Sequence, residues 1–164
     1  MKTVKRRSQK QEKYVAGVFN AKTVVASGAL WGAKGDVRND KFLIECKTTE
    51  KDFYPLTATV WEKIEEEATR DRARIPLMVI TVEDKHDLVV FNPKDFDSPF
   101  NYLYDNTPNG DSKSFRVNLK CLIEAEKRFE EHVYGKLFMI CGKKKNMLFL
   151  MRLNEFKEIF KEEL

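Results

Sequence analysis

Three ionisable side chains in the segment GDVRNDKFLIECK, residues 35–47, are of the types that bind a metal ion and hydrolyse a phosphodiester bond. Asp36 lies on one half of an expected β-hairpin, and Glu45 and Lys47 lie two residues apart on the other half. Carboxylate oxygens suit Mg²⁺ or Mn²⁺, ions that keep several waters and also bind substrate phosphate. A nearby ammonium orients the attacking water or helps to deprotonate it, and it stabilises charge at phosphorus.

The period of a β-strand determines where these side chains point. Side chains alternate between the two faces of a strand, so positions 42, 44 and 46 face the core while Glu45 and Lys47 point the other way. The pattern also fits an ordinary solvent-facing ion pair on an edge strand, with Asp36 as a polar residue near the turn. Like charges brought out of bulk water raise each other's pKa, so a cluster of carboxylates is costly unless a cation uses it.

The turn of the hairpin is expected at Asn39 and Asp40, both common turn residues. With the turn centred there, Asp36 faces Leu43 and lies one diagonal step from Glu45. Diagonal neighbours are roughly 7 to 8 Å apart at the backbone, which lets two carboxylates reach one ion. The sequence therefore predicts that one face of the hairpin collects both acids and the lysine.

The rest of the chain alternates helical and strand patterns, which predicts one α/β unit. An almost wholly apolar run, PLMVITV, is typical of a central strand covered on both faces. Two helix starts are expected from capping boxes, Ser8 with Gln11 and Thr59 with Glu62. Helices are expected over about 9–19, 59–75, 120–131 and after 153, and strands over about 23–26, 35–38, 41–47, 76–82, 87–91, 115–119, 135–141 and 146–153.

Composition sets the broad class. The chain has 164 residues, 42% of them hydrophobic and a net charge of +4, which fits one globular domain. No stretch approaches the roughly 20 apolar residues of a membrane span, and the basic start has no apolar segment behind it, so neither a membrane nor export is expected. The odd number of cysteines, without metal-type spacing, favours a reducing cytoplasm.

The segment from Ser27 to about residue 80 resembles the nuclease core of the PD-(D/E)XK superfamily, most closely the Holliday-junction resolvases of archaea and some phages. The resemblance covers residues 8–82 and depends on the order of a helix carboxylate, a Ser-Gly loop, an Asp strand and an E-x-K strand. It assigns Asp36, Glu45 and Lys47 to the motif and Glu12 to the helix carboxylate. One departure from the pattern is Gly35, where the family usually has proline.

This resemblance implies a restriction-endonuclease-like mixed sheet flanked by helices, with a core over about 8–91 and a C-terminal α+β extension over about 92–164. It implies Asp36, Glu45 and Glu12 as ligands of Mg²⁺, with Mn²⁺ as a substitute. Glu12 is nearly as well explained as a first-turn acid that favours the helix dipole. Candidate DNA contacts, each more often a plain surface charge or loop residue, are Ser27, Lys34, Arg38, Arg6, Arg7 and Lys10.

The expected function is a metal-dependent DNA endonuclease of recombination and repair, a homodimer that nicks two strands of a four-way junction in the cytoplasm, or in the host cytoplasm if the chain is phage-encoded. The apolar stripe of Phe156, Ile159 and Phe160 is a candidate dimer surface, although core packing explains it more simply. One alternative is a repair or restriction-type nuclease of the same fold that acts on duplex DNA. Another is a DNA-binding module that kept the fold and lost the reaction.

Overall fold

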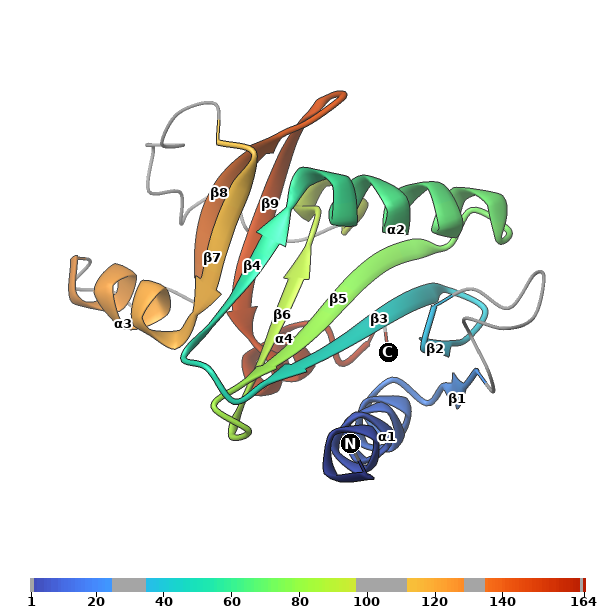
Figure 1. Ribbon diagram of the computed structural model, residues 1–164. Coiled ribbons are helices and arrows are strands. Elements are labelled where there is room, and N and C mark those ends of the chain that lie inside the picture. Colours follow the sequence, from blue (N-terminus) through green and yellow to red (C-terminus); the bar gives the residue numbers. More distant parts are fainter. Residues whose placement is uncertain (1, 25–34, 97–111, 129–134, 163) are drawn as a thin grey trace.

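The computed structural model describes residues 2–24, 35–96, 112–128, 135–162 and 164, and a seven-stranded sheet runs through this part of the chain (Figure 1). β3 and β5 run parallel, and every other neighbouring pair in this sheet is antiparallel. Across the sheet the strands follow the order β1 (Lys22–Thr23), β2 (Val37–Arg38), β3 (Phe42–Thr49), β5 (Ile75–Val82), β6 (His86–Phe91), β9 (Lys145–Arg152) and β8 (Gly135–Cys141).

Helices cover both faces of the sheet. α1 (Lys2–Val18) and α4 (Leu153–Ile159) pack on one face. α2 (Ala58–Arg70) and α3 (Leu119–Arg128) pack on the other, together with a two-stranded sheet of β4 (Phe53–Thr57) and β7 (Ser114–Asn118). A mixed sheet flanked by helices is the α/β fold class that the sequence predicts.

β5 lies at the centre of the sheet, as its apolar sequence predicts. Leu77 and Val79 face the core under α1 and α4, whereas Met78 and Ile80 face the core under α2. All four side chains are fully buried. A strand with apolar partners on both faces has no solvent side, which explains why PLMVITV shows no alternation of polar and apolar residues.

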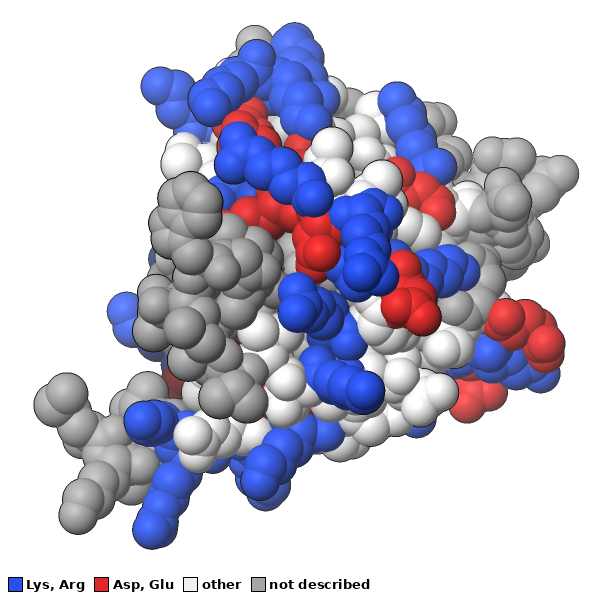
Figure 2. Space-filling view, turned by 90° about the vertical axis from the view of Figure 1, so that its right-hand side faces the viewer, with Lys and Arg blue, Asp and Glu red and all other residues white. Residues whose placement is uncertain are grey.

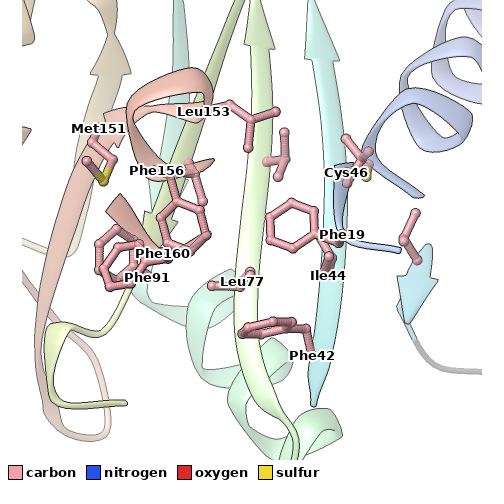
Figure 3. Packing of buried hydrophobic residues seen from close by; sticks show 14 of the residues in the cluster. Phe19, Phe42, Ile44, Cys46, Leu77, Phe91, Met151, Leu153, Phe156 and Phe160 are labelled. Carbon is pink, nitrogen blue, oxygen red and sulfur yellow. The ribbon is translucent and has the colours of Figure 1, made fainter. Parts of the chain in front are cut away.

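Phenylalanine rings fill the core between the sheet and α4 (Figure 3). Phe156 and Phe160 lie against the ring of Phe91, with centroids 5.2 and 5.8 Å away. Phe156 is fully buried and Phe160 is 2% exposed, while Ile159 packs against the same cluster. The stripe on the terminal helix is therefore core, and it is not the dimer surface considered from the sequence.

The C-terminal residues extend the sheet. β9 pairs with β6 from Leu88↔Arg152 to Phe91↔Phe149, and β8 pairs with β9 along its whole length. A 3₁₀-helix, η1 (Pro93–Asp95), follows β6, and most of the connection predicted over 92–111 lies outside the described residues. None of the helices in the described ranges has the length and apolar character needed to cross a bilayer.

The helix starts differ from the two predicted capping boxes. α1 begins at Lys2, so Ser8 lies inside the helix, where its hydroxyl donates to Glu12 Oε1 at 2.8 Å. α2 is capped by Thr57, whose hydroxyl accepts from the Val60 N–H, and not by Thr59. Strand β4 runs directly into α2 at Thr57, so the start of this helix is determined by the end of the strand.

The lysine-rich tip of the β8–β9 hairpin is exposed to solvent, and it also contacts α2. Lys144 Nζ lies 2.6 Å from Glu65 Oε2, and Lys143 Nζ lies 3.6 Å from Glu66 Oε1. Glu62 is 7% exposed and accepts the Lys144 N–H at 3.2 Å. Glu62 thus binds the hairpin instead of capping its own helix.

Candidate metal and nucleic-acid site

The candidate site lies just before β2 begins, where β3 continues beyond its pairing with β2. The hairpin pairs Val37 with Ile44 and Arg38 with Leu43, so its turn is shifted one residue from the position predicted. Arg38, and not Asp36, is therefore the partner of Leu43. Asp36 lies at the open end of the pair beside Ile44, whose carbonyl accepts the Asp36 N–H at 3.0 Å.

The carboxylate of Asp36 takes the place of a strand partner for β3. Its Oδ2 accepts the Cys46 N–H at 2.9 Å, one residue beyond Glu45. The backbone reaches this position through Gly35, which has a φ of +69°. A Cβ at Gly35 would lie 2.9 Å from Leu43 Cγ, and proline cannot adopt a positive φ. The local geometry therefore explains why glycine precedes Asp36 in this chain.

Glu45 and Lys47 form an ion pair on the same face of β3. Lys47 Nζ lies 2.7 Å from Glu45 Oε1, and the two side chains are 37% and 22% exposed respectively. Burial raises the pKa of Glu45 above its ordinary value, and the negative charge of Asp36 raises it further, while the hydrogen bond from Lys47 opposes both. Asp36 and Glu45 therefore lie close enough for their charges to repel each other.

The ammonium of Lys47 is stabilised by the same carboxylates. Burial alone lowers the pKa of Lys47, but the hydrogen bond to Glu45 and the charges of Glu45 and Asp36 more than offset this, so the pKa is raised overall. Lys47 is thus a cation at neutral pH. In this state it can stabilise negative charge and orient a water, but it cannot take a proton from that water.

Glu12 approaches the site from α1, on the opposite face of β3. Burial raises the pKa of the Cys46 thiol well above its ordinary value, and the charges of Asp36, Glu12 and Glu45 add to the effect, so all three carboxylates lie around Cys46. Within the described residues, however, no three His, Cys, Asp or Glu side chains form a group that could hold a metal ion. Glu12 instead accepts a hydrogen bond from Ser8.

The donor set at Asp36 and Glu45 fits a hard divalent cation. Both groups are carboxylates, and burial together with repulsion from Asp36 raises the pKa of Glu45, a repulsion that a cation would relieve. Mg²⁺ is commonly held by one or two carboxylates with waters and substrate phosphate, so two protein ligands suffice. Asp36 and Glu45 are therefore the residues that could hold such an ion, and Glu12 as a third ligand stays a prediction.

The predicted DNA contacts separate into three groups. Arg38 forms an ion pair with Asp71 at 3.2 Å, and Arg7 pairs with Glu50 and with Asp84. Arg6 and Lys10 are exposed on α1. Ser27 and Lys34 lie outside the described residues.

Positive charge nevertheless dominates one face of the molecule. Figure 2 shows Lys and Arg side chains spread across the side that carries α1, β1 and β2, with acidic side chains gathered in a few groups between them. A face of this kind suits a polyanion.

Two residues near the site carry no signal in the sequence. Tyr54 on β4 is half-buried, and burial raises its pKa, while Lys47 lowers it and Glu45 raises it. Glu67 on α2 adds a further, smaller negative influence on Glu45. Both residues approach β3 only because β4 and α2 fold over it, and no motif or spacing in the segment 53–67 marks them.

Comparisons with known proteins add little to this geometry. No family model matches the chain, and no curated protein matches it. Among solved structures, one similar chain is Hjc, a Holliday junction resolvase from the archaeal hyperthermophile Archaeoglobus fulgidus, with 16% sequence identity and a TM-score of 0.43. The match covers 66% of this chain and 85% of the archaeal chain. A likeness at this level does not by itself assign a function.

Proposed function

We propose that this protein is a metal-dependent DNA endonuclease of the PD-(D/E)XK type, with four-way junctions as its preferred substrate. The observation that carries the proposal is the arrangement of side chains where the pairing of β2 with β3 ends. There, Asp36 is tied to the backbone of β3 beside Glu45, and Glu45 is paired with the ammonium of Lys47 at 2.7 Å. Two half-buried carboxylates and a lysine close together on β3 and just before the start of β2 have the composition of a phosphodiester-hydrolysing site.

Asp36 and Glu45 would hold Mg²⁺ or Mn²⁺ in this proposal, and the family resemblance adds Glu12 as a third ligand, which would require its side chain to leave Ser8 and reach past β3. When bound, the ion supplies Lewis acidity and lowers the pKa of a coordinated water. Asp36 is held by the Cys46 N–H, so its position is set by the strand and not by its own rotamer alone. The site therefore presents at least one ligand in a fixed orientation before any ion arrives.

Lys47 acts in the proposal as a fixed cation. Its raised pKa keeps the ammonium charged, so it orients the attacking water and stabilises the negative charge that develops at phosphorus. This is the narrower of the two roles expected from the sequence, which also allowed Lys47 to help deprotonate the water. The proton of the water must then leave to solvent or to the substrate.

The DNA is recognised through its backbone and shape. Exposed lysines and arginines on the face of Figure 2 can contact phosphates, and phosphate contacts fix orientation without reading sequence. Branched DNA differs from linear duplex in the placement of its phosphates, so a shape-reading surface is sufficient for a resolvase.

Two cuts in a four-way junction require two active sites, which implies a homodimer. Cys46, Cys121 and Cys141 are not joined in disulfides, which fits a reducing cytoplasm.

The test of the proposal is cleavage of a synthetic four-way junction and of a linear duplex of equal length, each with Mg²⁺, with Mn²⁺ and with a chelator. Cleavage of the junction that requires the metal and exceeds cleavage of the duplex is expected. Equal cleavage of the two substrates would assign the protein instead to the repair or restriction-type nucleases. A chelator without effect would exclude the metal-dependent reaction.

A second candidate is a DNA-binding module without catalysis, and the Glu45–Lys47 ion pair is the observation that favours it. The Lys47 ammonium and the Glu45 carboxylate neutralise each other, with Nζ and Oε1 2.7 Å apart, so the pair is stable without a metal ion. This candidate predicts junction binding that neither Mg²⁺ nor Mn²⁺ converts into cleavage. The same cleavage experiment separates the two candidates, because only the nuclease yields product.

A further inference from the structure

A cavity of about 340 Å³ lies outside the candidate metal site, on the opposite face of β3. Its walls come from the middle of α1, from the ends of β3 and β5, from the turn between β5 and β6 and from the start of β6. Thr48 and Thr81, which are register partners, line it from the sheet. The cavity therefore begins one residue beyond Lys47, with the backbone of β3 between the two sites.

The base of this cavity is held rigidly by Gln11. The Gln11 amide nitrogen donates to Lys47 O and to Thr81 Oγ1, both at 2.8 Å, and to Val79 O at 3.3 Å. Carbonyl oxygens only accept hydrogen bonds, so these contacts fix which end of the amide faces the sheet. Gln11 is 7% exposed, and it fastens α1 across β3 and β5. A ligand in the cavity would meet a preformed wall.

The open side of the cavity carries an aromatic ring and unpaired cations. Tyr14 is 46% exposed, the most exposed of the large hydrophobic side chains in the described ranges. Lys10 and Lys85 also line the cavity, and neither side chain makes an ion pair with another described residue. Arg7 does not add to this free charge, since Glu50 and Asp84 already neutralise it.

We propose that this cavity binds one unpaired nucleotide of the DNA substrate, with its base stacked on Tyr14 and its phosphate contacted by Lys10 and Lys85. The proposal rests on the proposed function and extends it to substrates that carry single-stranded segments. An aromatic face next to positive charge is the combination that binds single strands, because every base offers a π-face and every linkage a phosphate. The volume lies within the range of sites for small ligands.

The geometry favours an unpaired nucleotide over paired duplex. Inside a duplex both faces of a base are covered by its neighbours, so away from the ends Tyr14 could stack only on a base that has left the helix. Asp87 also lines the cavity, and its negative charge disfavours the close approach of many phosphates at once, whereas the charge of Asp84 is offset by Arg7. One base with one phosphate satisfies the ring and the two lysines without bringing a second strand near Asp87.

The experiment measures binding in a chelator, so that no cleavage intervenes. The probes are a blunt duplex and the same duplex with a short 5′ or 3′ overhang that contains 2-aminopurine. Tyr14→Ala should weaken binding of at least one overhang by roughly 5- to 100-fold, and it should abolish the quenching of 2-aminopurine that stacking produces. Tyr14→Phe should retain both the affinity and the quenching, since the ring is kept.

The lysines are tested by salt dependence. Lys10→Gln and Lys85→Gln should each reduce the slope of log K against log salt by about 0.7 for the overhang probe. Lys120→Gln removes the same charge from an exposed position on α3 and should leave the slope unchanged. A free deoxynucleoside monophosphate should not displace the overhang at equimolar concentration, and displacement would overturn the assignment to a DNA strand.

The outcomes separate this inference from the proposed function. Equal binding of blunt and overhang probes, with no effect of Tyr14→Ala, would overturn the nucleotide site while junction cleavage remained. Loss of the overhang preference in Tyr14→Ala, with quenching restored by Tyr14→Phe, would support the site even in a protein that does not cut. Absence of binding to every DNA probe would remove both proposals.

Discussion

Replacing Asp36 by asparagine removes a negative charge next to Glu45. The substitution keeps a side-chain oxygen that can accept the Cys46 N–H. We expect the metal-free variant to be more stable than the natural protein at neutral pH, because relief of the repulsion from the more buried Glu45 outweighs the lost attraction to the more exposed Lys47. Each pKa unit of repulsion that is relieved corresponds to about 1.36 kcal/mol in the free energy of unfolding. In a chain of this size each kcal/mol raises the Tm by about 3 °C.

The pH dependence of this gain has a defined sign. A carboxyl whose folded pKa lies above its unfolded value binds its proton more tightly in the folded state, so the free energy of unfolding falls as pH rises past the ordinary pKa of 4.5. Burial of Glu45 is the larger cause and remains in the variant. The difference in Tm between Asp36→Asn and the natural protein should therefore be absent below pH 4, grow as Glu45 ionises and then stay constant.

Addition of metal should reverse the order of stability. An ion that binds only the folded state stabilises it by about 2.7 kcal/mol at 100 times its dissociation constant, which is about 8 °C here. Asp36→Asn loses a charged ligand and should show little of this increase. The natural protein is thus expected to melt below the variant in a chelator and above it in Mn²⁺.

Thermal unfolding followed by calorimetry over pH 3 to 8, with chelator or with Mn²⁺, measures both effects. Asp40→Asn is the matched control, because it removes the same charge from an exposed residue of the same hairpin and should change neither Tm nor the response to Mn²⁺. Two results would refute the reasoning. One is an Asp36→Asn protein that melts below the natural protein in chelator, and the other is a variant that keeps the full Mn²⁺ shift.

Three further predictions concern the site and the core. Lys47→Met should lower the rate of DNA cleavage at least 100-fold while junction binding in chelator changes less than twofold, and undiminished cleavage would remove Lys47 from the reaction. Gly35→Ala should lower the free energy of unfolding by about 1 to 3 kcal/mol in a denaturant titration, owing to its φ of +69° and the close Leu43, whereas Gly17→Ala, with open space around it, should not destabilise. Phe156→Ala should cost about 3 to 5 kcal/mol by the same titration, and a loss under 1 kcal/mol would contradict the packing around α4.

Prediction from the sequence succeeded where the physics is local. Alternation along a strand needs no knowledge of its partner, so the outward position of Glu45 and Lys47 follows from the spacing of the apolar residues around them. The same holds for β5, whose unbroken apolar run requires cover on both faces wherever the strand lies in the sheet.

Prediction failed where two positions of a turn, or two starts of a helix, have similar free energies. Turns centred one residue apart in the segment 38–41 are both compatible with its sequence, and the structure has the register that pairs Arg38 with Leu43. Ser8 and Thr59 both have the spacing of helix caps, yet Gln11 is taken by the backbone of β3 and Glu62 by the β8–β9 hairpin. A cap contributes on the order of 1 kcal/mol, which tertiary contacts readily outweigh.

The sequence by itself determined the residue types of the site, their side of the strand and the class of fold, because each follows from short-range periodicity and chemistry. Only the tertiary structure decided which groups meet. It tied Asp36 to Cys46, left Glu12 hydrogen-bonded to Ser8, neutralised Arg7 and Arg38 with acids, and formed a cavity beside Tyr14. These contacts join segments far apart in the chain, and their geometry depends on how α1, β3 and β5 pack together.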